Sequence, residues 1–203
     1  NMTQTTINVF GGNGFIGSRY CELTPNIIKN DRDDYKIKTN EVVYFISTRH
    51  NNNILSNPYI DIESNLITLI KVLESEKNNS NLIFNYISTY FVYAPKNAPI
   101  NEQDACDPKG FYSITKRTAE QLVESYCKTF NMSYRIIRLS NVIGPSTKTK
   151  PNAIDQLLES IKNNENIDLY DCGTHTRDFI YVDDVVHGVN VILDKGNINE
   201  IYN

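Results

Sequence analysis

One segment of this chain carries a phenol and an ammonium group at a spacing that places them on the same face of a helix. Tyr112 and Lys116 stand four residues apart, at the start of a stretch with helical periodicity over residues 112–130. A neighbouring positive charge favours a phenolate, and a phenolate can remove a proton from an alcohol. In a chain with 13 tyrosines the spacing alone also fits an exposed pair on a helix, so its surroundings must decide.

A run of residues that ends in hydroxyl groups supplies these surroundings. Residues 82–88 are mostly apolar and β-branched or aromatic, which predicts a buried strand, and Thr89 follows directly. In parallel α/β sheets, ligands bind beyond the carboxyl ends of the strands. We therefore expect Thr89 to lie near Tyr112, although its hydroxyl could instead only cap the next turn.

Glycines are concentrated near the start of the chain. Gly11, Gly14 and Gly17 are spaced three residues apart, after a predicted strand at 6–10 and before a short predicted helix at 18–23. A pyrophosphate binds to backbone N–H groups and the positive end of a helix, and Cβ atoms would block its approach. In this context the pattern predicts dinucleotide binding, with a flexible turn as the alternative.

Two charged residues follow the next predicted strand, at 26–30, where a ribose partner is expected. Asp31 would accept the ribose hydroxyls of NAD, whereas Arg32 would attract the 2′-phosphate of NADP. A solvated charged turn is the third interpretation. The residues leave the choice between NAD and NADP open.

The order of elements predicts the fold class. Further strands are expected at 42–46 and 134–139 and a second long helix at 61–76, so strands alternate with helices. This order is typical of a doubly wound, Rossmann-type α/β fold with a parallel sheet. The polar stretch 146–151 after Pro145 suggests a dinucleotide-binding domain at 1–145 and a partial substrate-binding domain at 146–203. In the latter we expect a helix at 153–162, a strand at 167–170 and a helix at 184–193.

Composition limits the partners. The net charge of −4 gives no reason to expect nucleic acid or an anionic membrane as a partner. No apolar run is long enough for a membrane helix and no signal-peptide pattern is present, so a cytoplasmic protein is expected. No metal site is expected either, because neither the cysteines nor the histidines have metal-ligand spacing: Cys21, Cys106, Cys127, Cys172, His50, His175 and His187.

Taken together, these motifs resemble those of an extended short-chain dehydrogenase/reductase, and most closely the NAD-dependent epimerase/dehydratase family that acts on nucleotide sugars. The resemblance extends to residues 58–65, similar to the segment that closes on the nicotinamide side. It includes the Arg-x-x-Asn-x-x-Gly-Pro motif at 138–145 and the nucleotide-diphosphate segment at 176–184. It therefore covers nearly the whole chain.

The resemblance implies a role for each matching residue. Tyr112 would remove the proton of a sugar hydroxyl while hydride passes to NAD or NADP, Lys116 would hold the nicotinamide ribose, and Thr89 would bond the same sugar oxygen. Asn141 and Arg177 would bind the substrate diphosphate, although a turn residue and a surface ion pair are the simpler interpretations. The expected cofactor-binding set is Gly11, Gly14, Phe15, Ile16, Gly17, Asp31, Arg32, Ser47, Asn65, Tyr112 and Lys116.

Three features depart from the family pattern. The chain is short between the first helix and residue 42, and it has less substrate domain than the family implies. The dehydratase branch has Thr-Asp-Glu at the strand end, where this chain has Thr89-Tyr90-Phe91.

We therefore expect a nucleotide-sugar epimerase that acts through a transient 4-keto sugar. An NADPH-dependent 4-keto-sugar reductase and a non-catalytic dinucleotide-binding module are the alternatives. The apolar helices 61–76 and 112–130 predict a homodimer.

Overall fold

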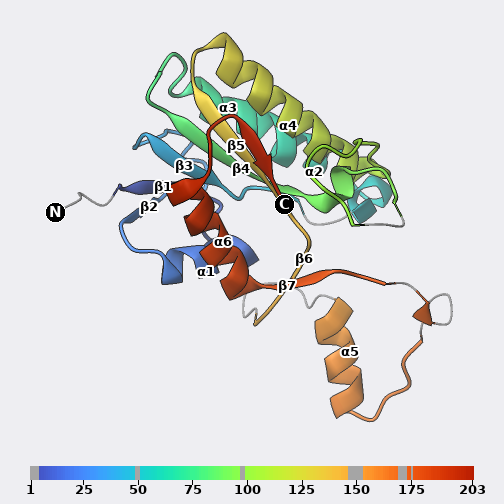
Figure 1. The fold of residues 1–203 in the computed structure, drawn as a ribbon. Helices are drawn as coiled ribbons and strands as arrows, with labels where there is room; N and C mark the ends of the chain where they lie inside the picture. The colour runs from blue at the N-terminus through green and yellow to red at the C-terminus, as the bar shows by residue number, and fades with distance from the viewer. Residues whose placement is uncertain (1–4, 49–50, 97–98, 146–152, 169–172, 175) are drawn as a thin grey trace.

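The structure is a computed structural model that describes residues 5–48, 51–96, 99–145, 153–168, 173–174 and 176–203. Its main sheet has six parallel strands in the order β2-β1-β3-β4-β5-β8 (Figure 1). The short apolar and β-branched runs of the sequence form these strands, as expected for a sheet buried on both faces. They are β1 (Ile7–Phe10), β2 (Ile27–Lys29), β3 (Glu41–Tyr44), β4 (Ile83–Thr89), β5 (Ser133–Leu139) and β8 (Glu200–Tyr202).

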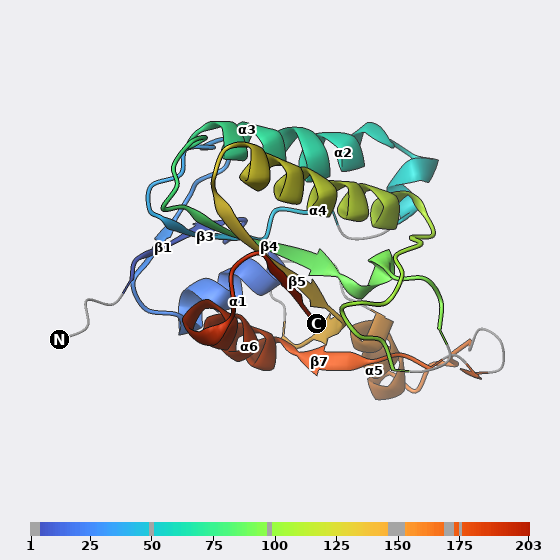
Figure 2. The ribbon, with the colours of Figure 1, turned by 45° about the horizontal axis from the view of Figure 1, so that its top comes forward.

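Helices cover both faces of this sheet. Helices α3 (Thr68–Glu74) and α4 (Phe111–Thr129) lie on one face, and α1 (Phe15–Leu23) and α6 (Val182–Lys195) lie on the other (Figure 2). Successive residues of a strand point to opposite faces. Along β3, for example, Val42 packs with α3 and α4 and Val43 packs with α6. The doubly wound α/β prediction is confirmed.

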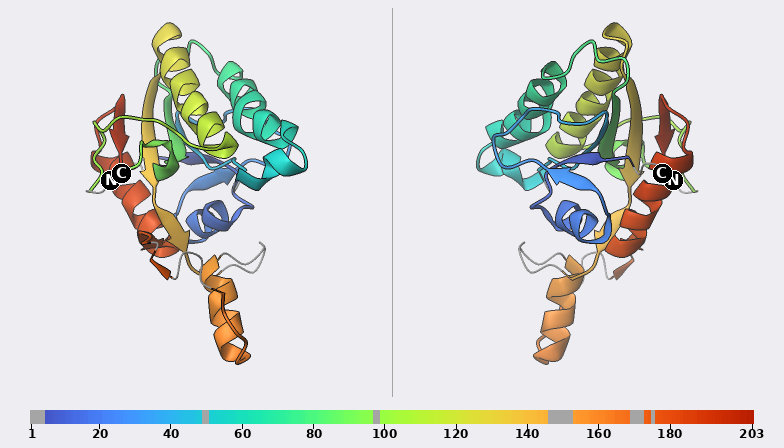
Figure 3. Two further views of the ribbon diagram at one scale, coloured as in Figure 1. Left: turned by 90° about the vertical axis from the view of Figure 1, so that its right-hand side faces the viewer. Right: turned by 90° about the vertical axis from the view of Figure 1, so that its left-hand side faces the viewer.

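A second, smaller unit follows β5. Strands β6 (Asn141–Ile143) and β7 (Phe179–Tyr181) form a two-stranded parallel sheet. Helix α5 (Ala153–Lys162) projects away from the three-layer body (Figure 3). The division of the chain at residue 145 stays a prediction. A boundary there does not follow the sheet, because α6 and β8 come later in the chain and pack with the six strands.

The structure differs from the sequence expectation in several elements. The helix expected at 61–76 consists of α2 (Tyr59–Ile62), a π-helical turn η2 (Glu63–Ile67) and α3. Residues 167–168 are not in a strand, and the remainder of the strand expected at 167–170 lies outside the described residues. Strands β6, β7 and β8 were not expected, because three residues are too few for a hydrophobic period. The remaining short elements are the 3-10 helices η1 (Asn51–Leu55) and η3 (Tyr90–Val92).

Two kinds of feature are absent from the described residues. None of their helices combines the length and apolar character needed to cross a membrane. Nor do three or more His, Cys, Asp or Glu side chains gather there in a way that could hold a metal ion. The segment 146–152, Cys172, His50 and His175 lie outside the described residues, so the structure does not describe the boundary region expected at 146–151.

Candidate functional site

A cavity of about 280 Å³ lies where the carboxyl ends of β1, β3, β4 and β5 meet. The glycine loop forms one wall of this cavity and the start of α4 forms another. This position follows from the fold, since parallel strands present their carboxyl ends at one edge of the sheet. The cavity is lined by Gly11, Gly14, Phe15, Ile16, Gly17, Phe45, Ser47, Thr48, Ile87, Ser88, Thr89, Phe91, Tyr112, Lys116, Leu139, Ser140, Asn141 and Val142.

The glycine loop permits contacts that larger residues would block. Gly11 has a φ of +79°, and a Cβ atom there would lie 2.8 Å from the backbone nitrogen of Ile46. A Cβ atom on Gly17 would overlap the carbonyl oxygen of Gly11. Gly14 is the N-cap of α1, and the first turn of that helix has no acidic residue. The helix N-terminus therefore presents free N–H groups and a positive dipole to the cavity, which suits a phosphate.

Tyr112 lies in the first turn of α4 and lines the cavity. Burial raises the pKa of its phenol, hydrogen bonds with Ser47 and Thr89 lower that pKa, and the charge of Asp61 raises it. Ser47 and Thr89 line the same cavity as Tyr112. In the protein by itself Tyr112 is a phenol at neutral pH, because burial has the largest effect.

Lys116 lies one turn further along α4, and its side chain is buried. Its Nζ donates a hydrogen bond of 2.7 Å to the carbonyl oxygen of Ile87 and lies 4.3 Å from the centre of the Tyr86 ring. Burial lowers the pKa of Lys116 to about 7, although the charge of Glu120 opposes this shift. The side chain of Lys116, which lines the cavity, therefore changes between its ammonium and amine forms close to neutral pH.

A buried ion pair lies behind Lys116. The Nε and Nη2 atoms of Arg138 donate to the two carboxylate oxygens of Glu120, at 3.0 and 2.8 Å. Arg117 donates to the same carboxylate at 2.8 Å. Because Glu120 is fully buried, these bonds are needed to offset the loss of its hydration. They fix the carboxylate whose charge acts on Lys116.

Thr89 lies in the cavity and also caps the next turn. It ends β4 and lines the cavity together with Tyr112. Its Oγ1 accepts a hydrogen bond of 3.3 Å from the backbone nitrogen of Phe91, which caps the short helix η3. The cap does not exclude a second bond, because a hydroxyl can accept one bond while it donates another.

The two predicted substrate residues are placed differently. Asn141 lines the cavity, and its Nδ2 donates to the carbonyl oxygen of Asp178 at 2.9 Å and to the hydroxyl of Tyr90 at 3.0 Å. Arg177 is exposed, and its Nη1 donates to the carbonyl oxygen of Thr176 at 2.9 Å. It is not among the described residues that line this cavity or the larger one beside it.

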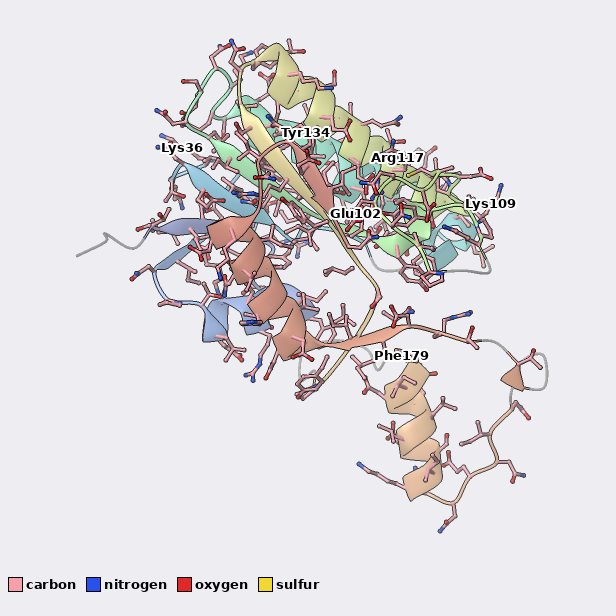
Figure 4. The ribbon with its side chains drawn as sticks, viewed as in Figure 1. Lys36, Glu102, Lys109, Arg117, Tyr134 and Phe179 are labelled. Atoms are coloured by element: carbon pink, nitrogen blue, oxygen red, sulfur yellow. The ribbon has the colours of Figure 1, made fainter. Side chains whose placement is uncertain are left out.

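The larger cavity, of about 790 Å³, lies between β5, α6 and the loop that follows β4. Leu139 and Ser140 line both cavities, so the two adjoin. Phe179 of β7, labelled in Figure 4, also lines the larger one. A ligand could therefore extend from the glycine loop toward the two-stranded sheet.

Three of the residues expected to bind the cofactor are not among those that line either cavity. Asp31 and Arg32 follow β2 and are exposed. Asn65 is fully buried in the π-helical turn, where it bonds Thr48 and Thr115. The other residues of the expected set do line the smaller cavity.

Sequence reasoning missed part of the cavity lining. The missed residues stand at or just beyond the ends of β3, β4 and β5, and that position is the signal that could have identified them. They are Phe45, Thr48, Ile87, Ser88, Phe91, Leu139, Ser140 and Val142.

Comparison with known proteins relates the chain to one family. A family model described as "NAD dependent epimerase/dehydratase family" matches residues 31–203, a span that begins after the glycine loop. The chain is 29% identical over 194 residues to a dTDP-D-glucose 4,6-dehydratase of Dictyostelium discoideum. That alignment covers 90% of this chain and 43% of the relative, so the chain spans less than half of that protein's length.

Two solved structures illustrate the similarity of fold. A UDP-N-acetylglucosamine 4-epimerase from Methanobrevibacter ruminantium, in complex with UDP-N-acetylmuramic acid, superposes with a TM-score of 0.85 at 22% identity. A UDP-glucuronic acid 4-epimerase from Bacillus cereus, in complex with UDP-glucuronic acid and NAD, gives a TM-score of 0.83 at 23% identity. The superpositions cover 98% and 97% of this chain and 76% of each of those structures.

Proposed function

The chain belongs to the NAD dependent epimerase/dehydratase family, and from this premise we propose that it epimerises a nucleotide sugar through a transient 4-keto sugar. NAD is the proposed cofactor. The observation that carries the proposal is that Thr89, Tyr112 and Lys116 line one cavity together with the glycine loop. A general base and a dinucleotide-binding turn therefore face the same space.

The residues present fit a dinucleotide. The open N-terminus of α1 suits the pyrophosphate, and Lys116 is placed to bind the nicotinamide ribose. When bound, NAD supplies the acceptor for a hydride from the sugar and the donor for its return. Asp31 and Arg32 both stand at the end of β2, where the adenosine ribose is expected, so Arg32 keeps NADP as an alternative.

In the proposed mechanism Tyr112 acts in its phenolate form, which the positive charges of Lys116 and of the oxidised nicotinamide would favour, and removes the proton of the sugar hydroxyl. Thr89 hydrogen-bonds the same sugar oxygen while its charge changes, and Lys116 provides the nearby positive charge. Lys116 can do so only while it is protonated, and its pKa of about 7 places this change near neutral pH. We further propose that Asn141 binds the substrate diphosphate, whereas Arg177, which is exposed and bonded to Thr176, would have to leave that position to reach it.

Epimerisation is favoured over dehydration by the residues that follow Thr89. Tyr90 and Phe91 stand where the dehydratase branch has an Asp-Glu pair. Their rings stack at a centroid distance of 4.3 Å. Neither side chain can act as a carboxylic acid and carboxylate in the elimination of water. The dehydratase from Dictyostelium discoideum is therefore a guide to the family and not to the proposed reaction.

We also propose a homodimer. Helices α3 and α4 lie side by side on one face of the sheet (Figure 2). Many apolar residues of α3 and α4 fill the core, but Ile62 at the end of α2, Ile67 in η2 and Ile114 of α4 remain exposed by 36%, 39% and 48%. A twofold contact across this face would bury them. Sedimentation over a range of concentrations tests this proposal, and a monomer throughout would contradict it.

Incubation of the purified protein with UDP-, GDP- and dTDP-sugars, in the presence of NAD or NADP, tests the proposed function. An epimerase converts one sugar into its epimer with no net accumulation of reduced cofactor. A reductase consumes NADPH only with a 4-keto sugar, and a dehydratase releases a 4-keto-6-deoxy product. Binding of the dinucleotide without turnover of any of these sugars would contradict the enzymatic proposal and favour the non-catalytic module.

A further inference from the structure

An aromatic side chain is exposed in the same cavity as the residues assigned to proton transfer. Phe91 is 44% exposed and lines the smaller cavity together with Thr89, Tyr112 and Lys116. Its backbone nitrogen donates to Thr89 Oγ1 at 3.3 Å, so the two residues belong to one short turn at the end of β4. Ligand sites are commonly lined by aromatic rings, which the bound molecule covers. A ligand held by Thr89 would therefore lie against this ring.

The ring of Phe91 is held in place by its neighbour Tyr90. The two rings stack, with 4.3 Å between their centroids and 29° between their planes. The hydroxyl of Tyr90 accepts a hydrogen bond of 3.0 Å from Nδ2 of Asn141, and the same Nδ2 donates to the carbonyl oxygen of Asp178 at 2.9 Å. Because Asn141 begins β6, this bond anchors Tyr90 to the two-stranded sheet. The position of the Phe91 ring is thus defined before a ligand binds.

The two rings lie at the junction of the two cavities. Phe91 lines the smaller cavity, Tyr90 lines the larger one, and Leu139 and Ser140 line both. A nucleotide sugar with its reacting carbon near Thr89 and its nucleotide in the larger cavity would cross this junction. The sugar is therefore the part of the substrate that lies beside the rings.

The cations that line the two cavities already have partners. A sugar carboxylate at the junction would have to compete with these partners for a positive charge. They are the Asp104 carboxylate for Lys96, at 2.7 and 2.9 Å, the Glu120 carboxylate for Arg138, at 2.8 and 3.0 Å, and the Ile87 carbonyl oxygen for Lys116, at 2.7 Å.

The larger cavity also carries uncompensated negative charge. Asp178 and Asp184 line it, and neither has an ion-pair partner among the residues that the structure describes. Arg177 stands next to Asp178 in the chain, but it does not belong to either lining as described, and its proposed role is at the diphosphate. The charges near the junction therefore disfavour a second anionic group on the sugar.

The substituent next to the reacting carbon determines whether the sugar carries such a charge. The proposed intermediate is a 4-keto sugar, so the reacting carbon is C4, and the adjacent C5 carries the variable group. This group is a hydroxymethyl or methyl group in a neutral hexose and a carboxylate in a hexuronate. A carboxylate against an apolar ring loses hydration without gaining a cation, whereas C–H groups lose little.

We propose that Phe91 is a specificity-determining residue of the sugar site: its ring contacts the sugar beside C4 and selects a neutral nucleotide hexose over a nucleotide hexuronate. Tyr90 is a positioning residue that holds this ring. The inference rests on the proposed function, which places the reacting carbon beside Thr89 and Tyr112.

Equilibrium binding in the presence of NADH or NADPH tests the inference. A reduced cofactor cannot accept a hydride, so the sugar is not oxidised during the titration. Comparison of UDP, GDP and dTDP first identifies the nucleotide that binds most tightly. Calorimetric titration then gives the Kd values of its glucose and glucuronic acid conjugates, which for UDP are UDP-glucose and UDP-glucuronic acid. We expect the glucose conjugate to bind at least about tenfold more tightly to the wild type.

Variants of the two rings show whether they cause this preference. Phe91→Ala should reduce the ratio of the two Kd values by roughly three- to tenfold, because the apolar surface is lost. Phe91→Arg supplies a cation for the carboxylate and should bring the ratio to about twofold or less, or reverse it. Tyr90→Ala should lower the ratio in the same direction, whereas a merely structural role would weaken both ligands alike.

Phe179→Ala is the matched control. Phe179 is 43% exposed, almost as much as Phe91, but it lines only the larger cavity. Its replacement should leave the ratio of the two Kd values unchanged, whatever it does to both affinities together. Because Phe91 is itself exposed, its replacement does not empty the core, and the test does not depend on a destabilised protein.

The outcomes separate this inference from the proposed function. Equal Kd values for the two conjugates in the wild type would overturn the inference, even if the protein epimerises either sugar. A ratio that Phe91→Arg leaves unchanged, or a failure to bind either conjugate, would overturn it as well. A preference for the glucose conjugate that depends on Phe91, without turnover of any nucleotide sugar, would support the inference and contradict the proposed function.

Discussion

The cavity over the six-stranded sheet and the segment after β5 differ in how their functional side chains are held. In the cavity, Thr89 and Lys116 are buried and hydrogen-bonded to the protein. In the segment after β5, Arg177 is exposed and Phe179 is 43% exposed on a sheet of only two strands. The groups assigned to proton transfer are thus fixed before any ligand binds, whereas one of those assigned to the diphosphate is not.

The side chains of the cavity are therefore preorganised, and those of the later segment are not. Burial disfavours the charged form of each group, so it raises the pKa of Tyr112 and lowers the pKa of Lys116. Groups fixed in this way need no reorganisation when charge develops. A guanidinium at the surface keeps its hydration and contributes only once a ligand orders it.

The strongest test of the comparison is Tyr112→Phe, which removes only the hydroxyl. We expect kcat to fall by roughly 10²- to 10⁴-fold, the usual contribution of a general base, with dinucleotide binding retained. Tyr126→Phe is the matched control, because Tyr126 lies on the same helix and its hydroxyl has no partner among the described residues. A loss of less than tenfold in Tyr112→Phe would remove this residue from the base role.

A second test concerns the glycine loop. Gly17→Ala places a Cβ atom against the carbonyl oxygen of Gly11, so the loop must shift and the Kd for the dinucleotide should rise by about a hundredfold or more. Gly188→Ala is the control, since a Cβ atom there meets nothing within 4 Å among the residues that the structure describes. Calorimetric titration with NAD measures both variants. Equal affinities would contradict the pyrophosphate assignment.

The buried ammonium predicts a pH dependence of stability. Because the pKa of Lys116 is lowered to about 7, the unfolded chain binds more protons than the folded one between about pH 7 and the ordinary lysine pKa. Relative to Lys116→Met, the free energy of unfolding of the wild type should therefore increase with pH over this window, by at most about 1.4 kcal/mol per pH unit. Urea unfolding at several pH values measures this difference. A difference independent of pH would show that Lys116 is not desolvated.

The smallest expected effects separate the two substrate residues. Asn141→Ala removes a side chain that lines the cavity, and we expect KM for the nucleotide sugar to rise about tenfold, as for one lost hydrogen bond to a charged group. Arg177→Ala should change KM by less than about threefold, because the residue is exposed and lies outside the lining described. Steady-state kinetics on both variants measures the two KM values. A larger rise in KM for Arg177→Ala than for Asn141→Ala would show that Arg177 moves to the diphosphate.

Much of the fold and part of the candidate site could be predicted from the sequence. The parallel sheet follows from apolar runs that alternate with helices, and the meeting of Thr89 with Tyr112 follows from a strand end and the start of a helix. The glycine spacing predicted a loop whose geometry indeed excludes a Cβ atom at Gly17. Whether these residues bind and react as proposed stays a prediction.

The remainder depends on contacts that local patterns do not contain. In the π-helical turn, the amide of Asn65 bonds both Thr48 and Thr115, which are far apart in the sequence. The cavity likewise brings together Ser47 and Tyr112 from two distant elements. Strands β6 to β8 are three residues each, and only their pairing identifies them.

A crystal structure of the protein with NAD is the most direct test of the central claim, that the phenol of Tyr112 faces a nicotinamide bound over the glycine loop. We predict the pyrophosphate at the N-terminus of α1 and the nicotinamide ring beside Tyr112 and Thr89, with its C4 atom within roughly 3 to 4 Å of the space for the sugar carbon. A dinucleotide bound elsewhere, or a nicotinamide ring turned away from these hydroxyls, would contradict the claim.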